Sequence, residues 1–211
     1  MQRRHIPARD IDTLGDISFD TALQAALRPS PDYDTAKWLF VPNTYTEYRY
    51  ILGTRGARPL ICLGVNPSTA APEHLDPTLQ SVQRIALNNG FDSFIMLNVC
   101  AQRATSPSDM AIEPSARLHA ENVRAFVYAL SLSDAPSVWA AWGNIIEQRA
   151  YLSGFVRDLF EASAARGAAW YRCGAISKRG HPHHPLYLRA DEPLVPFDMA
   201  RYAADLAQRR V

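Results

Sequence analysis

From Pro59 onward, short wholly apolar runs alternate with longer segments whose apolar residues recur at helical spacing. The runs are PLICLGV, SFIMLNV, SVWAAWG and AWYRCGAI, and the helical segments are DPTLQSVQRIALNNG, EPSARLHAENVRAFVYALS, IIEQRAYLSGFVRDLFEASAARG and FDMARYAADLAQRR. Strands buried on both faces are continuously apolar because helices cover both sides of a parallel sheet. The alternation therefore predicts an α/β fold, a three-layer sandwich with a central four-stranded parallel sheet.

The residues before Pro59 follow a different pattern. Ser18 to Leu27 fits a helix that either Asp16 or Ser18 caps. KWLFVPN and TEYRYIL fit two short strands, as a hairpin or an edge pair. We expect residues 1–58 to form an N-terminal extension packed on a core of residues 59–211, the whole being one globular domain.

Composition limits the function classes. The 211 residues are 47% hydrophobic with a formal net charge of +1, so no overall positive field attracts a polyanion, although a local basic rim can suffice. Three dispersed cysteines in apolar segments are too few for a disulfide framework, a zinc site or an iron–sulfur cluster. No apolar stretch follows the N-terminal arginines, and no run approaches the roughly 18 residues of a membrane helix. We expect a cytoplasmic monomer with no membrane segment, no metal and no cofactor.

Polar residues follow each of the four predicted core strands. They are the run from Asn66 to Thr69, then Asn98, then Gly143 and Asn144, and finally residues 177–186, which hold three histidines. In open α/β sheets the ligand binds beyond the carboxyl ends of the strands. The sequence therefore predicts that these residues converge on one site.

The same four segments resemble motifs of uracil-DNA glycosylases, in the same order. GVNPS resembles their first motif, IMLNV their second strand with its terminal asparagine, VWAAWG their third strand, and HPHHPL their His-Pro loop. A closer resemblance is to the domain-of-unknown-function family 1643, carried by YRYIL, GVNPSTA, DPTLQ, LNVCAQRAT, AWG and HPLYL, from about Tyr48 to Leu188.

The resemblance implies a DNA glycosylase, and because no lysine is convincingly placed in the predicted pocket, we expect it to be monofunctional, without lyase activity. Such an enzyme flips a base out of the stack and hydrolyses its N-glycosidic bond, leaving an abasic site. The site must stabilise an oxocarbenium-like sugar and a departing anionic base. The implied partner is DNA that carries modified bases, in repair or in defence against phage. Two alternatives remain open: a non-catalytic binder of nucleotides or modified DNA, and a nucleoside N-glycosidase.

Individual roles follow from the motif positions. Asn98 is the expected base reader, because an amide offers both a donor and an acceptor; otherwise it satisfies backbone groups. Asn66 is expected to orient water, unless it only shapes the turn. If a carboxylate is needed, Asp76 is the nearest in sequence, although it also fits an N-cap ahead of Pro77; Glu73 is a weaker candidate.

The run of histidines at 181–184 allows more than one alignment with the family's His-Pro motif. One of His181, His183 and His184 is expected to donate a hydrogen bond to the base oxygen that gains charge, as a neutral imidazole can. HPLYL favours His184 as the catalytic residue, with His181 as a base contact. The intervening prolines make the spacing awkward for two ligands on one metal ion.

Ser68 predicts the kind of base. Uracil-specific enzymes carry a tyrosine at the matching place, which fills the space beside C5 of the pyrimidine. A serine leaves room there, so we expect a 5-substituted pyrimidine, such as a hypermodified cytosine, rather than plain uracil. The alternative is that Tyr45 or Tyr48 fills the same space.

The remaining candidates are backbone and DNA contacts. The motifs imply that Gly64, Val65, Pro67 and Gly143 also border the base. Leu186 or Tyr187 is expected to push an apolar wedge into the duplex, unless they pack under the loop. Phosphate contacts are expected from the backbone amides of Ser68 and Thr69 and from four cations, which are Arg103, Lys178, Arg179 and Arg189, unless these four are ordinary surface charges.

Overall fold

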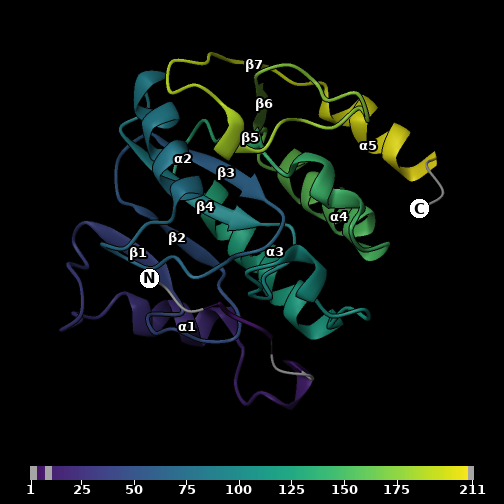
Figure 1. Cartoon of the computed structure of the whole chain (residues 1–211). Helices are drawn as coiled ribbons and strands as arrows, with labels where there is room; N and C mark the ends of the chain where they lie inside the picture. Colours follow the sequence, from purple (N-terminus) through teal and green to yellow (C-terminus); the bar gives the residue numbers. More distant parts are fainter. Residues whose placement is uncertain (1–3, 8–10, 209–211) are drawn as a thin grey trace.

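The protein is built around one mixed seven-stranded sheet. The computed structural model describes residues 4–7 and 11–208, and the strand order within them is β1-β2-β4-β3-β5-β6-β7. The strands are β1 (Trp38–Val41), β2 (Ile51–Thr54), β3 (Pro59–Gly64), β4 (Ser93–Asn98), β5 (Ser137–Ala140), β6 (Ala169–Cys173) and β7 (Leu194–Pro196). The α/β class is confirmed (Figure 1).

The expectation of a purely parallel four-stranded sheet is corrected by the strand pairing. The adjacent strands β4, β3, β5 and β6 are parallel to one another. β2 pairs antiparallel with β4, β1 pairs antiparallel with β2, and β7 pairs antiparallel with β6. The segment expected to pack on the core as an extension thus supplies two strands of the sheet itself.

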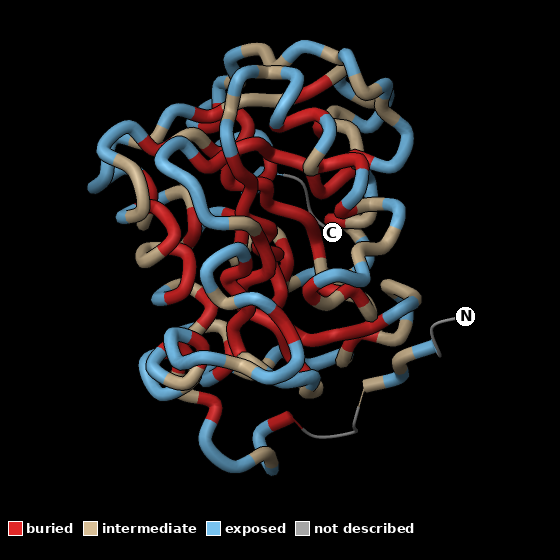
Figure 2. Tube along the Cα trace, turned by 90° about the vertical axis from the view of Figure 1, so that its left-hand side faces the viewer, coloured by how far each residue is buried: buried red, intermediate tan, exposed pale blue. Residues whose placement is uncertain are grey.

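Five α-helices of the described residues cover the two faces of the sheet unequally. They are α1 (Phe19–Ala26), α2 (Pro77–Asn88), α3 (Ala116–Leu130), α4 (Tyr151–Ala164) and α5 (Met199–Gln208). Leu60 and Cys62 of β3 belong to the apolar cluster under α2, whereas Ile61 and Leu63 belong to the cluster under the other four helices. This alternation explains why β3 and β4 are buried along their whole length. Figure 2 shows the buried segments running through the interior, with exposed segments around them.

Side-chain caps fix the helix starts. Ser18, one of the two expected caps, accepts a hydrogen bond from Thr21 N at 3.4 Å, and Asp76 caps α2 by accepting from Leu79 N at 2.9 Å. The helix expected from about Ile145 begins only at Tyr151, because Gly143–Glu147 form the 3-10 helix η3. Among residues 4–7 and 11–208, none of the helices combines the length and apolarity needed to span a bilayer.

Candidate functional site

A cavity of about 450 Å³ lies at the carboxyl ends of β3 and β4. Its walls come from the loop after β3, the first turn of α2, the end of β4, and the 3-10 helix η4 (Pro185–Tyr187). The structure brings together, around this cavity, the predicted site residues Gly64, Val65, Asn66, Ser68, Asp76, Asn98, His184, Leu186 and Tyr187. The volume lies within the range of ligand pockets, about 300–1,000 Å³.

Asn98 places an unpaired amide in the cavity wall. The residue is only 1% exposed, and neither Nδ2 nor Oδ1 of its side chain has a hydrogen-bond partner among the described residues. Its backbone is held, because Asn122 Nδ2 donates to the carbonyl oxygen of Asn98 at 2.8 Å. A buried polar group without a partner costs about 1–3 kcal/mol. The amide is therefore placed to offer one donor and one acceptor to the occupant of the cavity.

The side-chain amide of Asn66, unlike that of Asn98, is held by hydrogen bonds within the protein. Its Nδ2 donates to the carbonyl oxygens of Ala104 at 2.7 Å and Pro67 at 3.2 Å. These bonds assign the orientation of the amide and leave Oδ1 as an acceptor without a partner in the described part of the chain. Ala104 N in turn donates to the Pro67 carbonyl at 2.9 Å, so the loop is held rigidly. An acceptor in this position can orient water, although an amide is no strong base.

Asp76 occupies a position that fits both of the roles considered for it. It caps α2 through Leu79 N and it lines the cavity. Among the described residues that line the cavity, it is the sole carboxylate. Glu73 lies elsewhere, since its carboxylate accepts hydrogen bonds from Trp38 Nε1 at 2.6 Å and Lys37 Nζ at 3.2 Å.

His184 presents a neutral imidazole. Its Nδ1 accepts a hydrogen bond from Leu186 N at 3.4 Å, so the proton of the neutral ring resides on Nε2. Burial lowers the pKa of His184 below 6.5, and the nearby negative charge of Asp76 opposes that shift. Gly143 does not line the cavity; it lies beneath this histidine, where a Cβ atom would lie 3.2 Å from His184 Cβ.

His181 does not reach the cavity, which corrects the expected base contact. It is completely buried, and its ring nitrogens bond Glu147 Oε1 at 2.8 Å and the Tyr202 hydroxyl at 2.8 Å. Trp142 Nε1 donates to the same hydroxyl at 2.8 Å. Because Tyr202 belongs to α5, this network ties the His-Pro loop to the C-terminal helix.

Arg103 is also displaced from its expected role. Its side chain is buried, and Nη1 donates to the carbonyl oxygens of Ser68 and Ala70 while the guanidinium lies 4.2 Å from the ring centroid of Tyr45. A completely buried guanidinium does not contact a phosphate at the surface. Arg103 therefore holds the loop after β3.

The other predicted phosphate contacts lie outside the cavity wall. Lys178, Arg179 and Arg189 are exposed; Arg179 forms an ion pair with Glu147, and Arg189 pairs with Asp191 at 2.8 Å. Thr69 is in the loop after β3 but does not line the cavity, and neither does Pro67, which was expected to border the base. The contacts of these residues with DNA remain predictions.

Arg49 is the main lining residue that the sequence argument missed. It precedes β2, is 1% exposed, and its Nη1 donates to the carbonyl oxygen of Ala70 at 3.2 Å. The available signal was a single charge between Tyr48 and Tyr50 in an otherwise aromatic and apolar run. Other lining residues that were not predicted are Pro77, Thr78, Leu79, Met96, Ala104, Thr105, Pro107 and Ile145.

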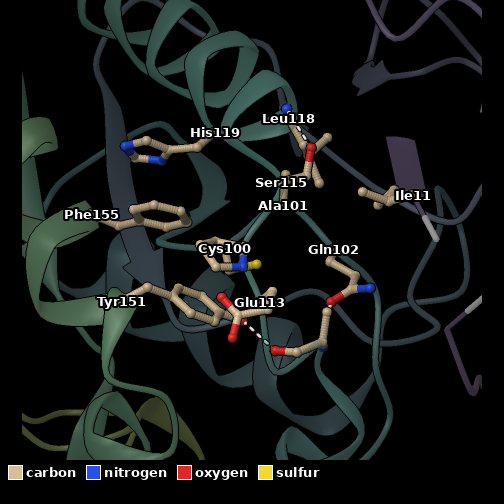
Figure 3. A pocket seen from close by; sticks show the side chains of 12 residues that line it. Ile11, Cys100, Ala101, Gln102, Glu113, Ser115, Leu118, His119, Tyr151 and Phe155 are labelled. Carbon is tan, nitrogen blue, oxygen red and sulfur yellow. Dashed lines mark hydrogen bonds between the residues drawn. The ribbon is translucent and has the colours of Figure 1, made fainter. Parts of the chain in front are cut away.

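A second cavity near the start of α3 is only about 20 Å³, the size of one water molecule. Figure 3 shows the rings of His119 and Phe155 beside it, and they stack at 3.5 Å between centroids with 4° between planes. A nucleobase does not fit there. In the described ranges 4–7 and 11–208, no cluster of three or more metal-ligating side chains is present.

Fold and cavity together define an α/β protein with a cavity, lined in part by polar side chains, beyond the carboxyl ends of its parallel strands. The chain belongs to the family described as "Protein of unknown function (DUF1643)", which matches residues 49–186. The matched segment begins at Arg49 and ends at Leu186, so it contains every described lining residue except Tyr187. The predicted membership of this family is confirmed. No curated protein and no solved structure matches the chain.

Proposed function

We propose that this chain is a DNA glycosylase with a uracil-DNA glycosylase-like fold, which flips out a 5-substituted pyrimidine and hydrolyses its N-glycosidic bond. The observation that carries the proposal is the buried Asn98 amide, whose donor and acceptor both lack a protein partner in the described structure. The polar edge of a pyrimidine offers the complementary pair of groups. This supports a base, rather than a sugar or an apolar ligand, as the occupant.

The groups that line the cavity with Asn98 suit hydrolysis of the N-glycosidic bond. When the C1′–N1 bond breaks, its electron pair stays on the base, and the Nε2–H of neutral His184 stabilises the base oxygen that gains charge. Asn66 Oδ1 positions a water molecule that forms the new C1′–O bond. The proton that this water loses passes to the carboxylate of Asp76, which lines the same cavity.

The room beside Ser68 supports a substituted base. Ser68 lines the cavity, whereas neither Tyr45 nor Tyr48 does. Tyr48 is 6% exposed and packs against Tyr50 with the two rings tilted by 51°, and Tyr45 packs against the guanidinium of Arg103. The side chains considered as substitutes for the missing tyrosine are thus engaged elsewhere.

The rim of the cavity supports DNA as the carrier of the base. Leu186 and Tyr187 on η4 are 45% and 79% exposed, although they are large and apolar. Apolar side chains in such positions unstack a base step by wedging into the duplex.

The proposal is tested on duplexes that each contain one uracil, thymine, cytosine, 5-hydroxymethylcytosine or glucosylated 5-hydroxymethylcytosine, by alkaline cleavage of abasic sites. We expect cleavage at a 5-substituted base, with loss of cleavage in Asn66→Ala and His184→Ala. His74→Ala is the matched control, because His74 is exposed and does not line the cavity. Undiminished cleavage in both site variants contradicts the site, and efficient excision of uracil alone contradicts the assignment of the base.

A second candidate function is non-catalytic binding of the same modified DNA. The observation that favours it is the amide of Asn66, which holds the first-motif position without a carboxylate. Binding to one modified duplex with a steep salt dependence, but without abasic sites, identifies this function. A nucleoside N-glycosidase instead releases the base from free nucleosides with little dependence on salt.

A further inference from the structure

The charged side chain of Arg49 lines the cavity, and no carboxylate of the described residues contacts it. Its side chain is 1% exposed, Nη1 donates to the Ala70 carbonyl at 3.2 Å, and Nε has no hydrogen-bond partner among the described residues. No ion pair joins Arg49 to any described carboxylate. It is also the sole cationic side chain of arginine or lysine type among the described lining residues.

The charges around Arg49 leave a positive excess. The second buried guanidinium, that of Arg103, lies close enough to repel it, and the one carboxylate of the cavity is Asp76. Burial is the largest cause of a pKa of about 9 for Arg49, with repulsion by Arg103 second. The guanidinium therefore stays charged at neutral pH.

The hydrogen bonds to the loop after β3 do not neutralise the charge of Arg49. Backbone carbonyls of Ser68 and Ala70 accept hydrogen bonds from the two arginines, but carbonyls carry no net charge. Burying an ion without a partner is costly, and the cost is offset when an opposite charge binds beside it. The start of the 12-residue helix α2, with Thr78 in its first turn, lines the same cavity, and the Asp76 carboxylate already caps it by accepting from Leu79 N.

We propose that the ligand carries an oxyanion, and that this group binds Arg49 inside the cavity. The proposal rests on the proposed function, because it adds a charge to the pyrimidine nucleotide assigned to the site. Two sources share this chemistry. One is a phosphate next to the flipped nucleoside, and the other is an acidic group on C5 of the base, in the room beside Ser68.

Two matched pairs of ligands separate these sources. The first pair is deoxycytidine and deoxycytidine 5′-monophosphate, measured by isothermal titration calorimetry. The second pair is one oligonucleotide with either 5-hydroxymethylcytosine or 5-carboxycytosine, measured by fluorescence anisotropy at fixed salt. We expect the anionic member of one pair to bind about tenfold or more tightly than its neutral partner, as charged hydrogen bonds do. The pair that shows the preference identifies the source.

Three variants assign the preference to Arg49. Arg49→Gln is expected to abolish it, and Arg49→Lys to keep part of it, because the charge remains while the second donor arm is lost. Asp76→Asn is expected to strengthen the preference severalfold, since it removes a negative charge and asparagine still caps α2. Arg124→Gln is the matched control, because that arginine is 55% exposed on α3, away from the cavity.

Equal binding within both pairs overturns the proposal, and so does a preference that survives in Arg49→Gln. If Arg49→Gln fails to fold, as judged by circular dichroism, an unchanged preference in Asp76→Asn overturns it. The proposed function is judged separately by excision from the duplex panel. Excision of a 5-substituted base without any preference for an anion rejects this inference alone, whereas an anion preference without excision rejects the glycosylase.

Discussion

Gly64 and Asn98 lie side by side at the ends of the parallel strands β3 and β4, and a Cβ atom at position 64 would lie 3.0 Å from Oδ1 of Asn98. The same atom would lie 2.6 Å from Met96 Cε. The absence of a side chain at Gly64 therefore gives the Asn98 amide its place in the cavity wall.

Gly64→Ala is expected to displace the Asn98 amide and to weaken excision. Overpacking of a buried site costs about 1–3 kcal/mol, and we expect a stability loss in this range by urea denaturation. Gly154→Ala is the control, because nothing lies within 4 Å of a Cβ there and alanine favours the helix α4. Unchanged excision in Gly64→Ala would show that the base does not depend on the position of Asn98.

Asn98→Leu is expected to separate function from stability. It removes a buried amide without a partner, whose cost is about 1–3 kcal/mol, so the free energy of unfolding should stay the same or rise. Excision should fall by about 10²-fold or more, because the base loses its reading group. Asn122→Leu is the comparison: its Nδ2 holds the carbonyl oxygens of Asn98 and Val99, so this variant should be less stable. A large loss of stability in Asn98→Leu would assign that residue to the core.

The central strands and the lining loops could be predicted because their signals are local. A buried strand is a continuous apolar run, and the polar residues that follow it point to the site, as Asn66 and Asn98 do. β7 could not be predicted, since its three residues become a strand only through pairing with Arg172 and its neighbours in β6. Short antiparallel edges of this kind carry no periodicity.

The choice between the histidines also required long-range contacts. His181 and His184 each precede a proline, so only the resemblance of HPLYL to the family motif favours His184. The bridge between Ile176 and Pro182 turns the loop so that His181 meets Tyr202 of α5, a residue distant in the chain. Arg49 reaches the cavity for a similar reason, because its backbone N donates to the carbonyl of Ala101 in the segment after β4.

Variants that disturb His184 and His181 are therefore expected to have different effects, the first on kcat and the second on stability. His184→Ala should lower kcat by about 10²–10³-fold, as loss of one donor to a developing anion does, with little change in stability. Tyr202→Phe, which leaves His181 Nδ1 and Trp142 Nε1 without this hydroxyl, should lower the free energy of unfolding by about 1–3 kcal/mol. Tyr128→Phe is the control, since no hydrogen bond of its hydroxyl is present among the described residues. The reverse pattern would make His181 the catalytic histidine.

The pH dependence should follow the lowered pKa of His184. Well above pH 6.5 the residue is neutral in the folded and unfolded states, so its contribution to stability is complete. As the pH falls below 6.5, the unfolded state binds the proton first, and this stability is lost until the lower pKa of the folded state is passed. Protonation also converts Nδ1 from an acceptor to a donor, so the bond from Leu186 N is lost.

His184→Gln should retain a donor but cannot titrate in this range. We expect its stability difference from the wild type to depend on pH only below 6.5, as measured by urea denaturation between pH 5 and 8. The difference between His184→Gln and the wild type is needed because burial also lowers the pKa of His119, which is present in both proteins and shifts stability in the same direction. An identical pH profile in both proteins would contradict the partly buried, neutral state of His184.

Tyr187 should matter for duplex DNA and not for single strands. Its side chain is 79% exposed on the rim, so its truncation to alanine should leave folding unchanged. Unstacking a base step costs a few kcal/mol, and a wedge that offsets about 1.4 kcal/mol of it changes the rate tenfold. Tyr187→Ala should therefore slow excision from a duplex about tenfold and leave excision from the same single strand nearly unchanged.

Ile112→Ala is the matched control for this wedge, because Ile112 is also 79% exposed but does not line the cavity. It should leave both rates unchanged. A duplex that contains a mismatch opposite the target base is already partly unstacked, so it should restore most of the rate lost in Tyr187→Ala. Equal slowing of the single-strand and duplex reactions would place Tyr187 at the base itself, in contact with the ring, rather than in the helix stack.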